Sequence, residues 1–251
     1  MTFKQWILST YPNPNAPGDG VFGPLHIITL VLCAAMVIIS TILFRKRSEK
    51  AKRIFLFTLA MIILVFGIIR RITGFINKEL TFNNIMYILL PRPGCAISCV
   101  LVILASIFNK KAWYNIASIV SLICAIIFFA YPGAGFINKY ILFEQLYSIV
   151  THSLFFVMSI LFMTLGLTEF RYKTCWKEAI AFVVIIIYSF LEIYVLKINA
   201  DPIYFMPNNE VQEIVGMGYA VYLALYMLFM FVYVNLFYLI GDRKAIIKRK
   251  K

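Results

Sequence analysis

Residues 23–53 read GPLHIITLVLCAAMVIISTILFRKRSEKAKR, an apolar run of 22 residues followed by nine that include six Lys or Arg. As an α-helix rising about 1.5 Å per residue, such a run spans a bilayer core of roughly 30 Å. The basic residues that follow mark the side of the membrane on which they are retained. This stretch therefore predicts a membrane-spanning helix over 23–44 that ends in the cytoplasm.

The same pattern recurs along the 251 residues, of which 62% are hydrophobic. A soluble domain could not cover so much apolar surface with polar side chains. We therefore predict an all-α polytopic bundle of about seven helices that forms a single transmembrane domain over 1–251. The six further helices are predicted at 54–75, 89–108, 113–130, 141–168, 178–197 and 217–241.

The distribution of basic residues predicts the orientation. The loop 45–53 and the tail 242–251 each hold six Lys or Arg, whereas the connections on the other side hold only Lys4, Lys78 and Lys139. Basic residues resist translocation, so we expect the N-terminus outside and 242–251 as a basic cytoplasmic tail. The net charge of +13 then comes from loops and not from a nucleic-acid-binding face, which would interleave basic and aromatic residues.

The first 22 residues do not form a span. Phe3, Trp6 and Tyr11 belong to a short apolar patch of the kind that favours the membrane interface, and a Pro-rich loop follows. No small-residue cleavage site is present, so we expect the first helix to be retained and 1–22 to be an extracytoplasmic interfacial segment.

The five cysteines show no metal-ligand spacing and no disulfide framework. No phosphate-binding glycine loop or nucleotide motif is visible either. We therefore expect no metal and no cofactor, with membrane lipids as partners and no nucleic acid. The Ile-, Lys- and Asn-rich composition favours a bacterial plasma membrane as the location.

Ionisable side chains inside a membrane are costly and mark candidate functional positions. Because alternate helices run in opposite directions, all of those found here fall in the outer half, which predicts an enclosed polar cavity open to the outer leaflet. Gln145, Ser148 and His152 also share one helix face by their spacing. The polar residues of the outer half are His26, Arg70, Arg71, Glu144, Gln145, His152, Glu192 and Lys197.

Structural interpretations exist for most of this set. Glu144 and Lys197 are also explained by interfacial positions from which the side chain extends to water. A helix-start histidine bonded to a loop carbonyl explains His26, and a structural ion pair with Arg70 explains Glu192. For His152, the deepest of the group, we favour a functional role.

The segment Leu90-Pro91-Arg92-Pro93-Gly94-Cys95 opens the predicted third helix. Its prolines and glycine predict an irregular first turn with free backbone N–H groups at a positive helix terminus. A thiolate is stabilised at such a position, so Cys95 is the best candidate nucleophile, with Arg92 beside it. The alternative is that Cys95 is a small packing residue.

These residues resemble the bacterial YwaF-type integral membrane proteins, a family distantly similar to an animal transmembrane acyltransferase that remodels ether phospholipids. The resemblance covers nearly the whole chain and implies Cys95 as the acyl-accepting nucleophile and His152 as the general base, with His26 a weaker correspondence. The matching segments are Phe22–His26, Leu90–Cys95, Tyr131–Gly133, His152–Ser153 and Asn199–Pro207.

One position departs from the family. Its usual sequence before the cysteine is Leu-Pro-Leu-His-Leu-Cys, and here Pro93 stands at the position of the histidine. The departure leaves open whether the chain is an active enzyme.

The function we predict is therefore a lipid acyltransferase or lipid hydrolase with a Cys nucleophile and a His base. Supporting or substrate-binding positions would be His26, Arg70, Arg92, Glu144, Gln145, Glu192 and Asn199. The alternatives are a small transporter or proton relay built on His152, Glu192 and Arg70, and a non-catalytic lipid-binding membrane protein.

Overall fold

The computed structural model describes residues 1–10, 22–91, 94–130, 136, 140–197, 207 and 209–249, without the side chains of 210, 211, 214 and 242–249. The described part is helical and contains no strand. Its elements are α1 (Phe3–Ile7), α2 (Pro24–Phe44), α3 (Glu49–Asn77), α4 (Phe82–Leu89), α5 (Gly94–Phe108), α6 (Lys111–Ala130), α7 (Phe143–Thr164), η2 (Tyr172–Thr174), α8 (Trp176–Phe190), η3 (Leu191–Val195), α9 (Glu210–Val215) and α10 (Tyr219–Arg249).

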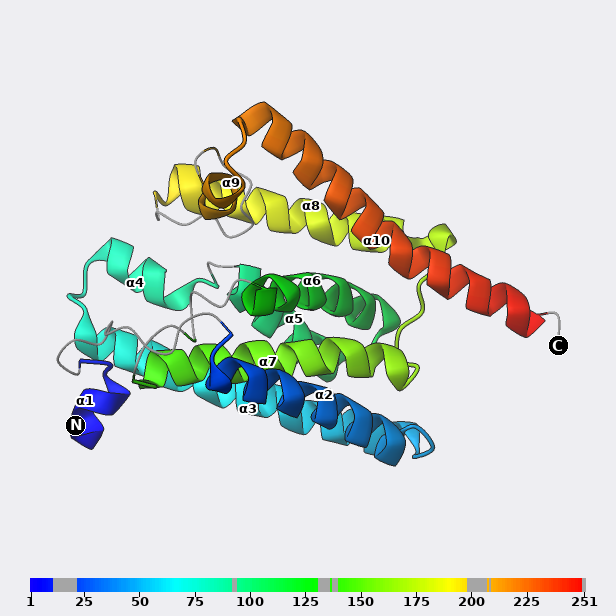
Figure 1. Cartoon of the computed structure of the whole chain (residues 1–251), viewed down its shortest axis with the longest axis horizontal. Helices are drawn as coiled ribbons and strands as arrows, with labels where there is room; N and C mark the ends of the chain where they lie inside the picture. The colour runs from blue at the N-terminus through cyan, green and yellow to red at the C-terminus, as the bar shows by residue number, and fades with distance from the viewer. Residues whose placement is uncertain are drawn as a thin grey trace.

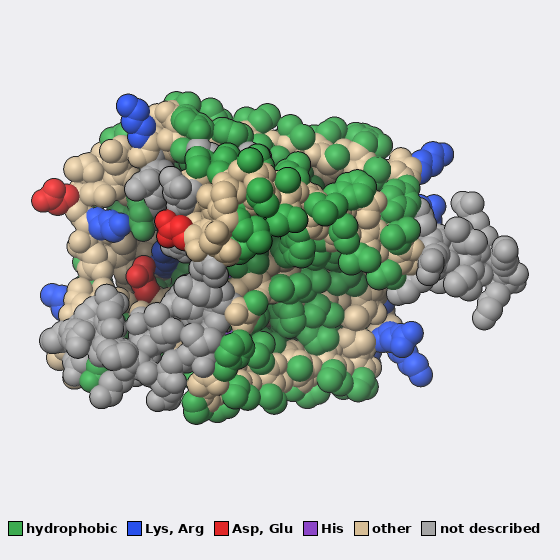
Figure 2. Space-filling model, turned by 45° about the horizontal axis from the view of Figure 1, so that its top comes forward, with side chains coloured by type: hydrophobic (Ala, Val, Ile, Leu, Met, Phe, Trp, Pro, Cys, Tyr) green, Lys and Arg blue, Asp and Glu red, His purple; other side chains and the backbone are tan. Residues whose placement is uncertain are grey.

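Six helices of the described part are long and apolar enough to cross a membrane, and the bent pair α4 and α5 makes a seventh candidate. The long helices lie roughly side by side along the longest axis of the molecule (Figure 1), which confirms the predicted polytopic bundle. Their outward faces expose large apolar side chains such as Val31, Ile42 and Phe231. Figure 2 shows an apolar middle with charged side chains at the two ends, as expected for helices surrounded by lipid.

Local sequence explains where the helices start and stop. Pro24 occupies the first position of α2, where its missing N–H costs nothing, and the Ser48 hydroxyl caps α3 by accepting from the N–H of Ala51 at 3.3 Å. Gly166 adopts a positive φ of 77° and ends α7. The N–H of Leu167 then donates to the Phe162 carbonyl at 2.9 Å, the bond that closes a Schellman motif.

The core lies among α2, α3, α5, α6 and α7, which form the main bundle in Figure 1. Large side chains such as Leu56 of α3 and Phe155 and Phe162 of α7 are completely buried there. The bundle has two ends. The α1 end holds α1 and the starts of α2, α5 and α7, and the opposite, basic end holds the loops before α3, α6 and α8.

The last two spans, α8 and α10, lie on α6 outside this bundle. The hydroxyl of Tyr233 donates to the Ile119 carbonyl at 2.8 Å, and Phe170 packs against Tyr238. Gly241 lies so close to Phe170 that a Cβ built on it would clash with the Phe170 carbonyl oxygen. These contacts fix α10 near the basic end, whereas much of its other half is exposed.

The short helix α1 is attached to the bundle by side-chain hydrogen bonds. The Trp6 indole donates to the Ile141 carbonyl at 2.9 Å, and the Asn77 amide donates to the Leu8 carbonyl at 2.7 Å. The interfacial segment predicted for 1–22 thus begins as a helix held against the ends of α3 and α7. Residues 11–21 lie outside the described part.

Several predicted boundaries were wrong. Residues 82–88, predicted to be loop, belong to α4, because the Thr81 hydroxyl caps a short apolar helix by accepting from the N–H of Asn84. The helix predicted over 54–75 begins at Glu49 inside the basic loop, and the one predicted to reach 168 ends at Thr164 because of Gly166. The helix predicted to end at 241 continues to Arg249 through most of the predicted tail.

Candidate functional site

The predicted site residues that the structure describes lie toward the α1 end. His26 is in the first turn of α2, Arg70 is near the end of α3, and Cys95 is in the first turn of α5. Glu144 is in the first turn of α7, and Glu192 lies in the π-helical turn η3 that ends α8. The alternation of helix direction, used above to assign depth, thus brings these residues to one end of the molecule.

Cys95 lies at the contact between α5 and α6. Its half-buried thiol lies beside the thiol of Cys124 on α6. One turn further along the same face of α5, Cys99 contacts the side chain of Thr151, the residue before His152 on α7. The face of α5 that carries Cys95 therefore meets both α6 and α7.

His152 is buried against the aromatic side chains of the core. Its ring stacks on Phe128 with 3.8 Å between the centroids, and Phe155 lies 4.9 Å away. Its Nδ1 lies 2.6 Å from the Ser148 carbonyl oxygen. A carbonyl oxygen only accepts, so Nδ1 carries the proton and Nε2 is left as the basic nitrogen of the neutral ring.

Cys95 and His152 approach the same stretch of α6 from different sides. Cys95 contacts Cys124, and His152 stacks on Phe128, one helical turn later. In the described part of the chain no hydrogen bond joins the thiol to the imidazole. Contacts between a nucleophile and its base are often looser before substrate binds than in the engaged complex.

Arg70 pairs with Glu144. The ion pair between Arg70 and Glu192 considered from the sequence is not formed among the described residues. Its Nη2 lies 3.6 Å from Glu144 Oε1, and its guanidinium lies 5.1 Å from the Tyr147 ring centroid. Glu192 is fully buried and accepts a hydrogen bond from the Tyr188 hydroxyl at 2.9 Å. Depth alone could not decide the pairing, because it does not say which helices are neighbours.

His26 and Gln145 have buried polar atoms without partners among the described residues. Both ring nitrogens of His26 and Oε1 of Gln145 make no hydrogen bond. The ring of His26 lies among those of Phe22, Phe129 and Phe136. The loop-carbonyl bond considered for His26 is therefore not formed in the described part.

Three sequence candidates cannot be placed. Arg92, Pro93 and Asn199 lie outside the described residues. No cluster of three or more His, Cys, Asp or Glu able to hold a metal ion occurs in the part that is described.

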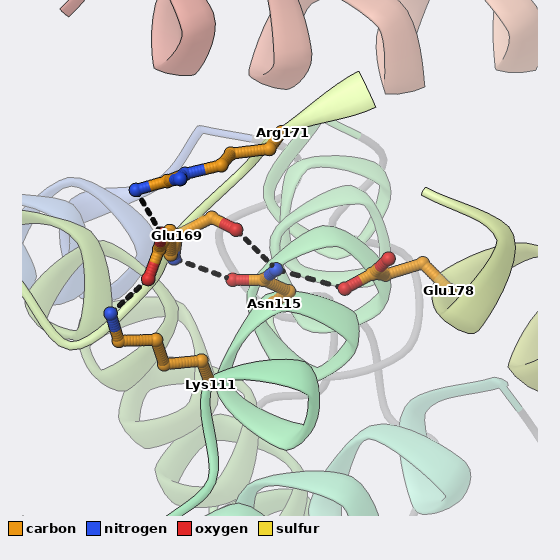
Figure 3. Close-up of polar contacts among 5 residues, drawn as sticks. All are labelled: Lys111, Asn115, Glu169, Arg171 and Glu178. Atoms are coloured by element: carbon orange, nitrogen blue, oxygen red, sulfur yellow. Dashed lines mark hydrogen bonds and ion pairs between the residues drawn. The ribbon is translucent and has the colours of Figure 1, made fainter. Parts of the chain in front are cut away.

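A polar network at the basic end was not predicted (Figure 3). The Asn115 amide of α6 donates to the Glu169 carbonyl at 2.9 Å and to Glu178 Oε1 of α8 at 2.8 Å, while its oxygen accepts from the Glu169 N–H at 2.9 Å. Lys111 and Arg171 both pair with the Glu169 carboxylate. The sequence signal for this network was Asn115 itself, a polar amide in the apolar run predicted as the helix 113–130.

Glu169 is the charged centre of this network. The hydrogen bond from Lys111 holds the pKa of Glu169 below its usual value, and the positive charge of Arg171 lowers it further. Together with Asn115, this residue links α6 to the segment that leads into α8.

The comparisons with known proteins agree with a membrane bundle. Residues 21–238, all but the first 20 and the last 13 of the chain, match the TMEM164 family. The chain belongs to this family. As a TMEM164 family member it is a multi-pass integral membrane protein, and the matched region includes Cys95, His152 and the Asn115 network. The searches of curated proteins and of solved structures gave no match.

Proposed function

We propose that this chain is a lipid acyltransferase or lipid hydrolase that works within the membrane, with Cys95 as nucleophile and His152 as general base. One observation carries the proposal. The bond from Nδ1 to the Ser148 carbonyl, at 2.6 Å, fixes the tautomer in which Nε2 accepts a proton. Thiol acyl transfer uses an oriented base of this kind that can reach the cysteine, and α7, which carries His152, packs against α5, which carries Cys95.

The proposed reaction has two steps. The Cys95 sulfur attacks the carbonyl carbon of a lipid ester while its proton moves to His152 Nε2, and the departing alcohol then takes that proton. The resulting thioester is cleaved by a second alcohol in a transferase or by water in a hydrolase, which restores the thiol. N–H groups at the start of α5 are candidates to stabilise the oxyanion that forms in each step.

The α1 end also suits a lipid headgroup. Arg70 is partly exposed, and its pairing with Glu144 at 3.6 Å is loose. A phosphate would compete well for such a guanidinium, because charge-assisted bonds to phosphate form readily at partly exposed sites. We therefore propose membrane phospholipids as the substrate class. From the Ile-, Lys- and Asn-rich composition we also propose a bacterial plasma membrane as the location.

The observed contacts favour this function over a proton relay through Arg70, Glu192 and His152. Arg70 is paired with Glu144, and His152 is bonded to its own helix. A non-catalytic lipid-binding role, suggested by Pro93 at the family's histidine position, is an outcome of the test that follows.

The test is acyl labelling of the purified protein. After incubation with phospholipid bearing a labelled acyl chain, we expect a hydroxylamine-sensitive label on wild type, none on Cys95→Ala and little on His152→Ala. Cys124→Ala is the matched control, because it removes the neighbouring thiol and should keep the label. Label on Cys95→Ala would refute the nucleophile, and no label on wild type would favour the binding role.

A relay makes a different prediction. In proteoliposomes it would give a proton or ion flux that His152→Ala abolishes and Cys95→Ala leaves unchanged.

A further inference from the structure

His26 is a buried imidazole whose described neighbours are mainly aromatic side chains. Its exposed fraction is 0%, and its ring centroid lies 4.6 Å from that of Phe136 and 5.1 Å from that of Phe22. Phe129 lies 6.1 Å away in a nearly parallel plane. Neither ring nitrogen makes a hydrogen bond in the described part of the chain.

A buried imidazole without hydrogen bonds raises the free energy of the folded state unless a ligand supplies those bonds. A neutral imidazole carries one donor and one acceptor, and buried polar atoms in proteins almost always have partners. The Phe129 carbonyl lies near the ring but outside normal hydrogen-bond geometry, and a carbonyl could serve only the N–H. The second nitrogen needs a donor, and none is in reach among the described residues.

The position of His26 connects it to the proposed active site. The Phe136 ring, 4.6 Å from His26, is 5.4 Å from Phe128. Phe128 in turn stacks on His152. The two histidines of the chain thus lie at the ends of one cluster of aromatic side chains.

We propose that His26 binds a hydroxyl group of a lipid, accepting a hydrogen bond from the O–H while Phe22 and Phe136 contact the apolar part beside it. A neutral hydroxyl fits better than a phosphate, because His26 forms no ion pair with any described residue and lies among aromatic rings. The proposal rests on the proposed function and deepens it, since His26 belongs to the same aromatic cluster as His152 and would select substrate lipids that carry a free hydroxyl.

The experiment compares two lipids on the full chain, purified in detergent and carrying Cys95→Ala so that no covalent step occurs. Lysophosphatidylcholine has a free glycerol hydroxyl, and an alkylphosphocholine of equal chain length has none. Affinity is measured from the shift in thermal unfolding during titration. We expect the hydroxylated lipid to bind about tenfold more tightly, the effect of one good buried hydrogen bond.

Two histidine variants complete the test. His26→Phe keeps a ring in the cluster and should lose the preference, whereas His152→Phe, the matched control, should keep it. A preference that survives in His26→Phe, or is missing from the Cys95→Ala parent, would overturn the proposal.

A second readout does not depend on the folding of any His26 variant. With 15N-labelled histidine the chain gives signals from only two imidazoles. Lysophosphatidylcholine should shift the unprotonated ring nitrogen of His26, and the alkylphosphocholine should not; an unchanged signal with both lipids would contradict the proposal. Because Cys95 is absent, failure of acyl labelling would reject the enzyme and leave this lipid site standing.

Discussion

The imidazole of His152 lies almost flat on the ring of Phe128, with 3.8 Å between the centroids and 17° between the planes. The Ser148 carbonyl holds Nδ1 of the same imidazole at 2.6 Å. The stack fixes the tilt of the imidazole and the hydrogen bond fixes its rotation, so Nε2 points in one direction. Phe128 belongs to α6, the helix whose Cys124 contacts Cys95.

We expect Phe128→Leu to slow acylation of Cys95 by about tenfold or more, because a displaced base loses much of its effect. The measurement is the rate of hydroxylamine-sensitive labelling. Phe162→Leu is the matched control, since Phe162 is a fully buried Phe of the same core that packs on Tyr114 instead. Both variants should lose about 1–2 kcal/mol of stability, and equal labelling rates would show that the stack does not orient the base.

Asn115→Ala should reduce the free energy of unfolding by about 2–4 kcal/mol, because it removes a donor to the buried Glu178 carboxylate. Thermal unfolding in detergent measures the loss. Asn235→Ala removes a less buried amide that bonds to Tyr172 and to its own helix, and it should cost less than about 1 kcal/mol. Equal losses would mean that the network does not hold α8 on α6.

Glu169, the charged centre of the network, predicts that the stability of the protein decreases at acid pH. Folding lowers the pKa of Glu169 from its ordinary value of 4.5. The ionised Glu169 carboxylate therefore contributes its full stabilisation of the fold above pH 4.5, and this contribution is lost as the pH falls through the lowered pKa. Glu169→Gln should therefore be less stable than wild type at neutral pH and lose less stability below about pH 4.5. Unfolding curves across this range test the difference, with exposed Glu79→Gln at the other end as the control. Parallel curves for wild type and Glu169→Gln would refute the coupling.

A glycine controls how α10 meets the bundle. Gly241→Ala would bring a Cβ into a clash with the Phe170 carbonyl oxygen, so we expect it to cost about 1–3 kcal/mol even though Ala favours helices. Gly218→Ala, at the start of the same helix and with nothing within 4 Å, should change stability by less than about 1 kcal/mol. If neither substitution changed the stability measured by thermal unfolding, α10 and Phe170 would be able to move apart to accept the Cβ, and the prediction would be wrong.

The sequence was sufficient to predict the spans, because apolar runs near 20 residues long have few alternatives in a membrane protein. It also placed His26, Arg70, Cys95 and Glu144 at one end, since helix direction alternates. It missed α4, whose eight residues are too few to stand out by length. Side-chain caps and single glycines such as Gly166 decided the remaining boundaries.

Partners were harder to predict than positions. Hydropathy gives the depth of a residue but not the neighbour it faces, so Arg70 was considered with Glu192 although Glu144 is its partner. Asn115 lies near the basic end and not among the polar residues of the outer half, so it was not predicted as a site residue. Its role depends on Glu169 and Glu178, which lie 54 and 63 residues away along the chain.

The attachment of α8 and α10 to the outside of an already packed bundle has a consequence for biosynthesis. The helices that share the main core end at Thr164, so a nascent chain that has emerged that far holds all five of them. The last two spans leave the ribosome later and find Asn115, Ile119 and Phe170 already in place as docking points. The order of translation thus matches the order in which these helices can assemble.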